Sequence, residues 1–307
     1  FLYSGNHIND LFFQINKFKK FNIKPIYIFD GKPPSEKNET LEKRYKKKIQ
    51  GKHKIIELKK KLEDLRRKPS FDTNLEKKLL KDIIHLEKKQ LYITREVIER
   101  SKQLFNYMGV HYIVAPCEAE HYCSLMIKSY LVDLVLSEDM DTIPCGSHIT
   151  LRSFSNKQDY VLEYRLEKIL NNLNLNMDEF IDMSILFGGD YIHINNKDTK
   201  YNYELIKTYH NLENLVLNSK IKKHDFILYR NLYRLNNIKL LNEHVIEINK
   251  YKKTNIRKLD KFLKKYSTLD KKVYYYRINK MFYKNGFKCD CIKNIYYKKL
   301  KNNYIKL

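Results

Sequence analysis

Tryptophan is absent from this sequence, and glycine, proline and cysteine are scarce, with 8, 6 and 5 residues among 307. The cysteines are odd in number and include no Cys-x-x-Cys pair, which disfavours both a disulfide scaffold and a structural zinc site. No apolar run approaches the roughly 18–20 residues that a membrane helix needs. These absences predict a soluble intracellular protein with no membrane partner.

Negative charge is also in short supply. The chain has 60 lysines and arginines against 36 aspartates and glutamates, a formal net charge of +24. Residues 37–102 hold 22 basic and 11 acidic side chains, and residues 251–307 hold 18 and 3. Basic segments of this kind bind phosphate backbones by counterion release, although a solvated surface or a membrane-surface patch has the same composition. Because tyrosine and phenylalanine alternate with the lysines, nucleic acid is the favoured partner.

Apolar residues make up 43% of the chain, enough to fill the core of one large domain or two small ones. Helical spacing of apolar residues predicts a helix over 7–22, and residues 38–105 are predicted to be almost wholly helical with a break near Pro69. Short β-branched and aromatic runs predict strands at 26–29, 110–114, 133–137 and 149–154. Further helices are predicted near 164–173 and 178–187. This alternation predicts an α/β fold, a mostly parallel twisted sheet flanked by helices.

Six acidic side chains lie where predicted strands or helices end or begin: Asp30, Glu118, Glu120, Asp139, Asp141 and Asp190. Ligands of open α/β sheets bind at the carboxyl ends of strands, so these side chains are candidates to converge. Gathered carboxylates repel one another unless cations neutralise them, and oxygen-only ligands favour Mg²⁺ or Mn²⁺ over zinc. Two such ions about 4 Å apart would clamp both oxygens of a phosphoryl displacement. Surface acids and helix caps remain the alternative for any single residue.

Four ordered blocks around these acids carry a family resemblance: Ile23–Pro34 (IKPIYIFDGKPP), Met108–Glu120 (MGVHYIVAPCEAE), Ser137–Thr142 (SEDMDT) and Ile185–Tyr191 (ILFGGDY). In these blocks the sequence resembles the flap endonucleases of the XPG-type structure-specific nucleases. The resemblance runs clearly from His7 to about Val216, and residues 256–285 show a weaker similarity. Because the four blocks keep their order along the chain, they are far more specific together than any one of them alone.

The resemblance implies a PIN-like nuclease core that cuts DNA near the base of a 5′ flap with two Mg²⁺ ions, for which Mn²⁺ is a possible substitute. It implies metal ligation, directly or through water, by the six acidic residues named above. Lys37 and Arg44 stand where the family has two basic catalytic residues, and their spacing places them on one helix face, two turns apart. Cations there would stabilise charge on the scissile phosphate. The alternative for these two residues is ordinary solvated helix charge.

The resemblance also divides the chain into four parts. These are an incomplete N-terminal part of the nuclease core (1–36), a basic helical arch over the single-stranded flap (37–105), the core with the acidic cluster (106–190) and a helical, basic DNA-binding region (191–307). Lys46 and Lys47, on the arch, are expected to contact DNA.

Two departures from the family pattern bear on activity. The family has a first strand, a further catalytic aspartate and a stacking aromatic ahead of the position that Phe1 occupies here, so we expect this sequence to be a piece of a longer protein. The stretch 193–200 also lacks the glycines of the family's DNA-gripping hairpin, where glycine lets the backbone approach phosphate closely. Lys197 and Lys200 are expected to substitute there by charge.

The sequence thus leads to one main hypothesis and two alternatives. The main one is a 5′ flap endonuclease and 5′–3′ exonuclease that hydrolyses DNA phosphodiester bonds in replication and repair, in the nucleus or another DNA-replicating compartment. One alternative is a catalytically impaired protein that binds branched DNA without cutting it, and another is a nuclease that acts on RNA. Branched or flapped DNA is the expected partner, with no small-molecule cofactor. A sliding clamp is a further candidate partner, but the sequence has no clear docking motif for one near the C-terminus.

Overall fold

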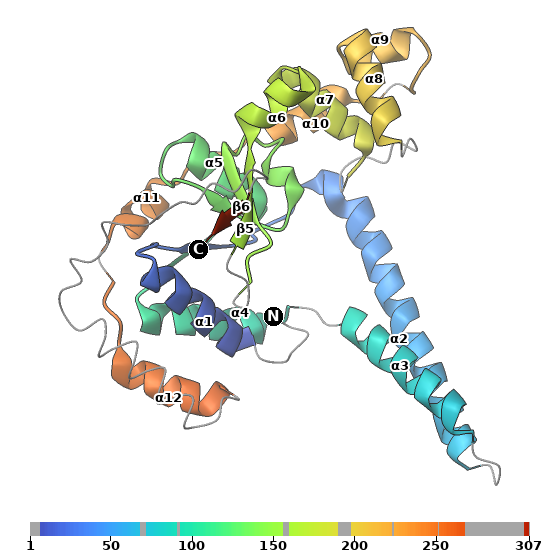
Figure 1. The fold of residues 1–307 in the computed structure, drawn as a ribbon, viewed down its shortest axis with the longest axis vertical. Coiled ribbons are helices and arrows are strands. Elements are labelled where there is room, and N and C mark those ends of the chain that lie inside the picture. Colours follow the sequence, from blue (N-terminus) through green and yellow to red (C-terminus); the bar gives the residue numbers. More distant parts are fainter. Residues whose placement is uncertain are drawn as a thin grey trace.

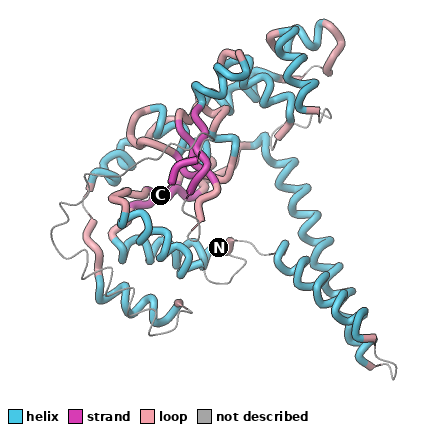
Figure 2. The backbone as a smooth tube through the Cα atoms, viewed as in Figure 1, coloured by secondary structure: helices cyan, strands magenta, loops and turns pink. Residues whose placement is uncertain are grey.

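The computed structural model describes residues 7–67, 72–90, 93–155, 160–189, 198–222, 224–250, 252–267 and 304–306. These residues form a central region of strands and helices, from which a long helical pair projects on one side and a group of shorter helices on another (Figure 1). The structure is mostly helical, with the strands gathered in the middle (Figure 2). Within this described part of the chain, no helix is long and apolar enough to cross a membrane.

Two small sheets form the centre of the fold. The first pairs β1 (Ile26–Phe29) in parallel with β2 (His111–Val114). The second sheet has the strand order β3-β4-β5-β6. It contains β3 (Val135–Leu136), β4 (Ile149–Arg152), β5 (Tyr160–Arg165) and β6 (Tyr304–Lys306). β3 and β4 run parallel, whereas β5 is antiparallel to both β4 and β6.

The prediction of one mostly parallel sheet is therefore correct only in part. All four predicted strands are present in shortened form, but they are divided between two sheets, and the second sheet is mixed. The connection from Arg152 to Tyr160 is too short for a crossover, so β5 has to return antiparallel to β4. β5 itself was not predicted. Its sequence runs directly into α6 (Leu166–Leu173), and the prediction assigned the junction to a helix.

Different helices cover the two faces of β1. Successive side chains of a strand point to opposite faces. Tyr27 and Phe29 pack in a cluster with α1 (His7–Lys20), α4 (Arg95–Met108) and α12 (Ile256–Tyr266). Ile26 and Ile28 pack instead in a cluster with α5 (Ala119–Lys128) and α11 (Asn242–Asn249). The two-stranded sheet is thus enclosed by helices, as an α/β layer fold requires.

The predicted helix over 7–22 is confirmed as α1, and its packing follows its periodicity. Ile8, Phe12 and Ile15 are buried at helical spacing. They meet α4, whose Phe105 stacks on Tyr27 with ring centroids 4.1 Å apart. Offset aromatic pairs of this kind add to the free energy of apolar burial. The expected boundary of the arch at residue 105 falls inside α4. The buried side chains of α4 pack with those of α1 and α12.

The projecting pair consists of α2 (Asn38–Arg66) and α3 (Thr73–Lys89), which run antiparallel (Figure 1). The expected break near Pro69 lies between them, outside the described residues. Leu58 and Leu62 of α2 pack against Ile83 of α3 in a small apolar cluster. Two cross-helix ion pairs flank it, Lys59–Glu87 at 2.7 Å and Arg66–Glu76 at 2.6 Å. The narrow apolar stripe read from the sequence is therefore enough to hold two helices together, with their other faces in water.

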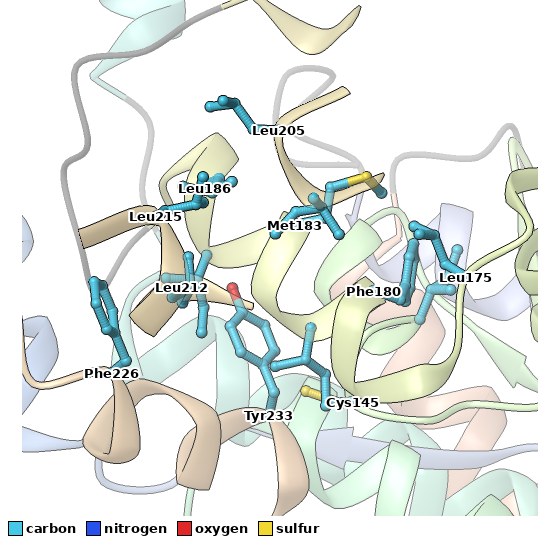
Figure 3. Close-up of a cluster of buried hydrophobic side chains, with 14 of the residues drawn as sticks. Cys145, Leu175, Phe180, Met183, Leu186, Leu205, Leu212, Leu215, Phe226 and Tyr233 are labelled. Atoms are coloured by element: carbon cyan, nitrogen blue, oxygen red, sulfur yellow. The ribbon is translucent and has the colours of Figure 1, made fainter. Parts of the chain in front are cut away.

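The remaining helices form a second core of their own. It is built from α6, α7 (Met177–Phe187), α8 (Thr199–Tyr209), α9 (Leu212–Leu217) and α10 (Phe226–Arg234). Figure 3 shows Phe180 and Met183 of α7, Leu212 of α9 and Tyr233 of α10 directed into this cluster. The predicted helix near 178–187 is α7. Its apolar side chains pack against those of the other helices in this core.

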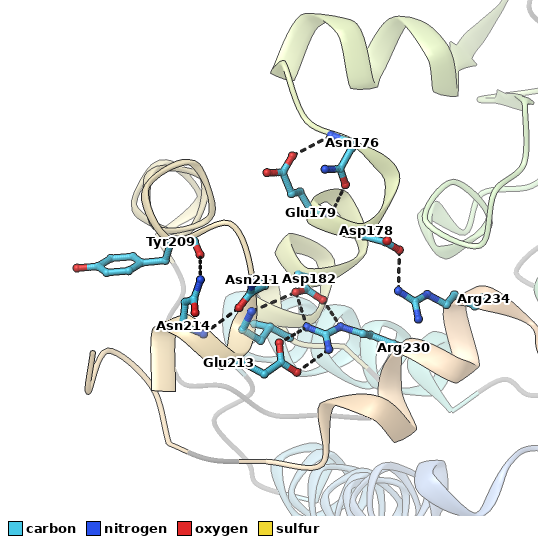
Figure 4. A network of polar contacts seen from close by, with 11 residues as sticks. Asn176, Asp178, Glu179, Asp182, Tyr209, Asn211, Glu213, Asn214, Arg230 and Arg234 are labelled. Atoms are coloured by element: carbon cyan, nitrogen blue, oxygen red, sulfur yellow. Dashed lines mark hydrogen bonds and ion pairs between the residues drawn. The ribbon is translucent and has the colours of Figure 1, made fainter. Parts of the chain in front are cut away.

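A buried polar cluster fixes three of these helices to one another (Figure 4). Asp182 of α7, 2% exposed, accepts two hydrogen bonds from the guanidinium of Arg230 on α10, both 2.5 Å, and one from the backbone N–H of Leu212 at 3.1 Å. Arg230 also donates to Glu213 of α9 at 2.6 and 2.8 Å, which lowers the pKa of that carboxyl. Among the described residues, Arg230 supplies the compensating charge for the buried carboxylate of Asp182.

Replacing Arg230 is therefore expected to destabilise the fold strongly. Arg230→Ala leaves the buried charge of Asp182 without its main partner, and the expected loss is about 3 kcal/mol of unfolding free energy, measured by urea denaturation. Arg234→Ala is the matched control, because Arg234 pairs at 2.7 Å with Asp178, whose side chain is 71% exposed. Exposed pairs contribute roughly 0–1 kcal/mol. Equal losses for the two variants would contradict this account of the cluster.

Candidate functional site

The parallel pairing of β1 and β2 brings two predicted site residues together. Both strands end at the same edge, with Phe29 opposite Val114. Beyond that edge the two chains remain hydrogen-bonded: Gly31 N–H donates to the carbonyl of Cys117 at 2.7 Å. The backbone N–H of Ala119 donates to Oδ1 of Asp30 at 2.9 Å. Asp30 therefore lies at the N-terminus of α5, where the free N–H groups of the helix favour a negative charge.

Three more of the predicted acids are held by local backbone structure. Glu118 is the residue before α5, and it is buried, whereas Glu120 lies in the first turn of that helix. Asp139 follows β3 and precedes a short 3-10 helix, Met140–Thr142, whose N-terminus it caps by accepting a hydrogen bond from the N–H of Asp141 at 2.9 Å. As predicted, these acids follow the carboxyl ends of strands or begin the next helix.

The electrostatics show that four of these carboxylates share one neighbourhood. Burial, together with the charges of Glu118, Asp139 and Asp30, raises the pKa of Glu120 to about 7. Burial and the charges of Glu118, Glu120 and Asp30 raise the pKa of the Cys117 thiol to about 11. Burial raises the pKa of the Cys145 thiol, and the charges of Asp141, Glu120 and Asp139 act in the same direction. A cation placed among these oxygens would offset the repulsion that adds to burial in raising these pKa values.

The chemistry of this donor set fits a hard divalent cation, because every charged ligand is a carboxylate oxygen. The described residues nevertheless contain no group of three or more His, Cys, Asp or Glu side chains arranged to hold an ion. Two of the oxygens are engaged within the protein, since Asp30 accepts from Ala119 and Glu118 is paired with Lys37. The sixth predicted ligand, Asp190, lies outside the described residues. The carboxylates are therefore gathered but not closed into a metal site.

Four of the six predicted basic residues lie at or near the start of α2. Lys37 ends the 3-10 helix Ser35–Lys37 that precedes α2, and its side chain is buried against Glu118. Arg44, Lys46 and Lys47 are exposed on the first turns of α2. Further away, Lys200 is exposed on α8, and Lys197 lies outside the described residues. Lys37 is thus the predicted basic residue that the structure brings to the carboxylates.

Two features of the site were missed by the sequence reasoning. His121 is 1% exposed and lies within the charge fields of Glu118, Lys37 and Asp139, where burial lowers its pKa and favours the neutral imidazole. The sequence could have indicated His121 as a site residue, because it lies three residues after Glu118 at the start of the predicted helix. The pairing of Lys37 with Glu118 had no such signal, because the two residues are 81 positions apart.

Comparison with known families and proteins gives a consistent result. The XPG N-terminal domain matches residues 2–51, and the XPG I-region matches residues 109–190. Flap endonuclease 1 of Plasmodium knowlesi (strain H) is 34% identical over 229 residues, which are 69% of this chain and 36% of that protein. Flap endonuclease 1 of Aedes aegypti is 33% identical over 223 residues, 71% of this chain and 54% of that protein. The chain therefore spans between a third and about half of the curated relatives it matches.

Solved structures share the fold. The catalytic core of Rad2 in complex with DNA substrate has a TM-score of 0.63 and 21% identity, covering 91% of this chain and 85% of that one. Flap endonuclease-1 from Methanococcus jannaschii has a TM-score of 0.62 and 21% identity, with 90% and 80% covered. The resolving enzyme GEN1 in complex with product DNA and Mg²⁺ has a TM-score of 0.56 and 18% identity, with 89% and 63% covered.

The close approach of β1 and β2 beyond their shared edge makes Gly31 a test of this geometry. A Cβ at Gly31 would lie 1.8 Å from the carbonyl oxygen of Ala115, so Gly31→Ala has to push the two chains apart. The expected cost is about 2–3 kcal/mol of unfolding free energy. Gly189→Ala is the control, because its Cβ would meet only the Tyr233 hydroxyl, at 3.7 Å. Thermal or urea unfolding compares them, and a neutral Gly31→Ala would refute the geometry.

Proposed function

Because the chain belongs to the XPG family, we propose that it is a structure-specific nuclease that cuts DNA near the base of a 5′ flap and degrades DNA from 5′ ends. This activity serves DNA replication and repair, in the nucleus or another DNA-replicating compartment. Flapped or branched DNA is its partner. The reaction is hydrolysis of a phosphodiester bond with two Mg²⁺ ions, for which Mn²⁺ is a possible substitute.

One observation carries the proposal: four acidic side chains from three separate segments share a single electrostatic neighbourhood at the base of a basic helical pair. Burial and three neighbouring carboxylates raise the pKa of Glu120 to about 7. A fold that served structure alone would gain nothing from gathering like charges in this way, since their repulsion lowers stability. A site that binds divalent cations needs this concentration of charge, and strongly perturbed groups of this kind mark functional sites.

In the proposed mechanism the ligands are Asp30, Glu118, Glu120, Asp139, Asp141 and Asp190. Bound Mg²⁺ would activate the attacking water and stabilise the leaving oxygen. The remaining work falls to the protein's own cations at the arch base. Lys37 and Arg44 stabilise the charge that develops on the scissile phosphate. Lys46 and Lys47 hold the single-stranded flap by contacts to its phosphates, and Lys197 and Lys200 hold the duplex.

A second candidate function is supported by the incomplete closure of the acidic group among the described residues. In that case the chain binds branched DNA without cutting it. Affinity and turnover separate the two candidates: binding with cleavage supports the nuclease, and undiminished affinity with no cleavage at any Mg²⁺ or Mn²⁺ concentration supports the binding protein. RNA flaps in the same assay test the third possibility.

Asp139 provides the sharpest test of the nuclease. With a labelled 5′ flap substrate and Mg²⁺, Asp139→Ala is expected to lower the single-turnover rate by about 10³-fold, because a metal ligand contributes several kcal/mol to the transition state. Lys37→Ala is expected to lower it by about 10²-fold, the usual effect of losing one charge-stabilising group. Asp133→Ala is the control, since Asp133 is exposed and lies outside the acidic group. Equal rates for all three variants would reject the assignment.

The flap-contacting role of Lys46 and Lys47 predicts a change in salt dependence. Each single-strand phosphate contact contributes about 0.7 to the slope of log affinity against log salt. The double variant Lys46→Ala/Lys47→Ala should therefore lower the slope by about 1.4 for a flap substrate, as measured by fluorescence anisotropy. Lys77→Ala/Lys78→Ala removes the same charge from exposed positions on α3 and should change the slope less. Equal changes would show that only total arch charge matters.

A further inference from the structure

The side chain of Lys37 is in an unusual place for a lysine. It extends from the base of the arch to the start of α5, where its ammonium forms a hydrogen-bonded ion pair with Oε1 of Glu118. Lys37 is 8% exposed and Glu118 is 5% exposed. Lysine is almost never buried to this degree without a partner. The pair also joins two segments that are 81 positions apart, the start of the arch and the acidic centre of the core.

The oxygen that Lys37 contacts is one that the proposed metal site needs. Glu118 lies among Asp30, Glu120 and Asp139, whose mutual repulsion calls for positive charge. Lys37 supplies such a charge in the structure. It therefore does for Glu118 part of what a divalent cation would do, and its ammonium is buried in doing so.

We propose that Lys37 is a stand-in cation: it neutralises Glu118 when the site holds no metal, and it gives up that carboxylate to a divalent ion when the site fills. The inference rests on the proposed function, because it takes Glu118 as a metal ligand. Lys37 then becomes available to the scissile phosphate only in the metal-loaded protein. Metal loading and the delivery of a catalytic charge are thereby coupled through one side chain.

The chemistry of lysine suits this exchange. Its ammonium is a compact point charge on a flexible four-carbon stem, so it can leave one partner and reach another without movement of the backbone. A divalent ion beside Glu118 would repel the ammonium through a short distance of low dielectric. Arginine would fit the role poorly, because its planar fork holds a carboxylate through two hydrogen bonds and gives it up less readily.

Binding of Mn²⁺ alone, without DNA, tests the exchange. Isothermal titration should show that Lys37→Met binds Mn²⁺ at least about tenfold more tightly than the wild type. The reason is that the variant lacks the positive charge that repels an ion bound beside Glu118. The metal-free variant should unfold at a lower temperature than the wild type, because the buried ion pair of Glu118 with Lys37 is lost. Lys37→Arg keeps the positive charge, so it should bind Mn²⁺ no more tightly than the wild type.

The reactivity of the Lys37 amine gives a second test in the unmodified protein. Reductive methylation followed by peptide mass spectrometry should label Lys37 slowly without metal and at least about fivefold faster with saturating Mn²⁺, because the amine leaves its buried ion pair. Lys60, exposed on α2, is the reference and should react at one rate throughout. If Lys37→Met does not fold, this measurement decides the question alone.

The outcomes separate the exchange from the proposed function. Equal Mn²⁺ affinities for wild type and Lys37→Met, or a labelling rate of Lys37 that metal leaves unchanged, would overturn the exchange and leave the metal site standing. Failure of both proteins to bind Mn²⁺ would overturn the exchange and the two-metal nuclease together. Tighter binding by Lys37→Met with faster labelling of wild-type Lys37 would support both.

Discussion

Repulsion among carboxylates at the ends of β1, β2 and β3 is the constraint around which the rest of this molecule is arranged. Burial and the charges of Glu118, Asp139 and Asp30 all raise the pKa of Glu120, so these four acidic groups disfavour one another's charge. The fold offsets this with several local devices. Asp30 accepts a hydrogen bond from a backbone N–H at the start of α5, and Asp139 caps a short 3-10 helix. Glu118 forms an ion pair with the ammonium of Lys37. Each device is one that a bound cation could supplement or replace.

The ion pair of Lys37 also ties the arch to the core. Lys37 directly precedes α2, so its contact with Glu118 fixes the base of a helix that extends far from the body of the protein (Figure 1). The distal part of α2 is stiffened by α3 through Leu58 and Leu62, whereas the proximal part exposes Arg44 and its basic neighbours. α2 is thus held at its start by the ion pair of Lys37 and along its distal part by α3, with the basic stretch between the two. The ion pair of Lys37 with Glu118 therefore fixes the start of basic helix α2 relative to the acidic group.

The sequence predicted those parts of the fold that depend on local periodicity and missed those that depend on distant contacts. α1 was predictable because Ile8, Phe12 and Ile15 recur at helical spacing, and β1 because IYIF is a short β-branched and aromatic run between turn signals. β5 was missed because YVLEYR has one fully buried position, Val161, and continues without a break into α6. A strand of that kind is defined by its pairing with β4, which no local pattern records.

The candidate site divides in the same way. Acids at strand ends were predictable because parallel strands bring their carboxyl ends to one edge, and there Asp30 accepts a hydrogen bond from Ala119, the residue after Glu118. That Lys37 would be the buried cation was not predictable. It is one of 60 lysines and arginines in the sequence. Only the packing of the arch base onto α5 singles it out, since burial is a property of the assembled fold.

A buried ion pair of this kind needs a reason beyond stability. Removing two charges from water costs several kcal/mol for each, and well-packed apolar residues in their place are often as stable or more so. Lys37 and Glu118 therefore gain little for the fold by being charged. A pair of apolar residues at the start of α2 could neither neutralise a carboxylate of the acidic group nor release a positive charge. The proposed exchange of cations gives this buried lysine a role that an apolar residue at the same position could not fill.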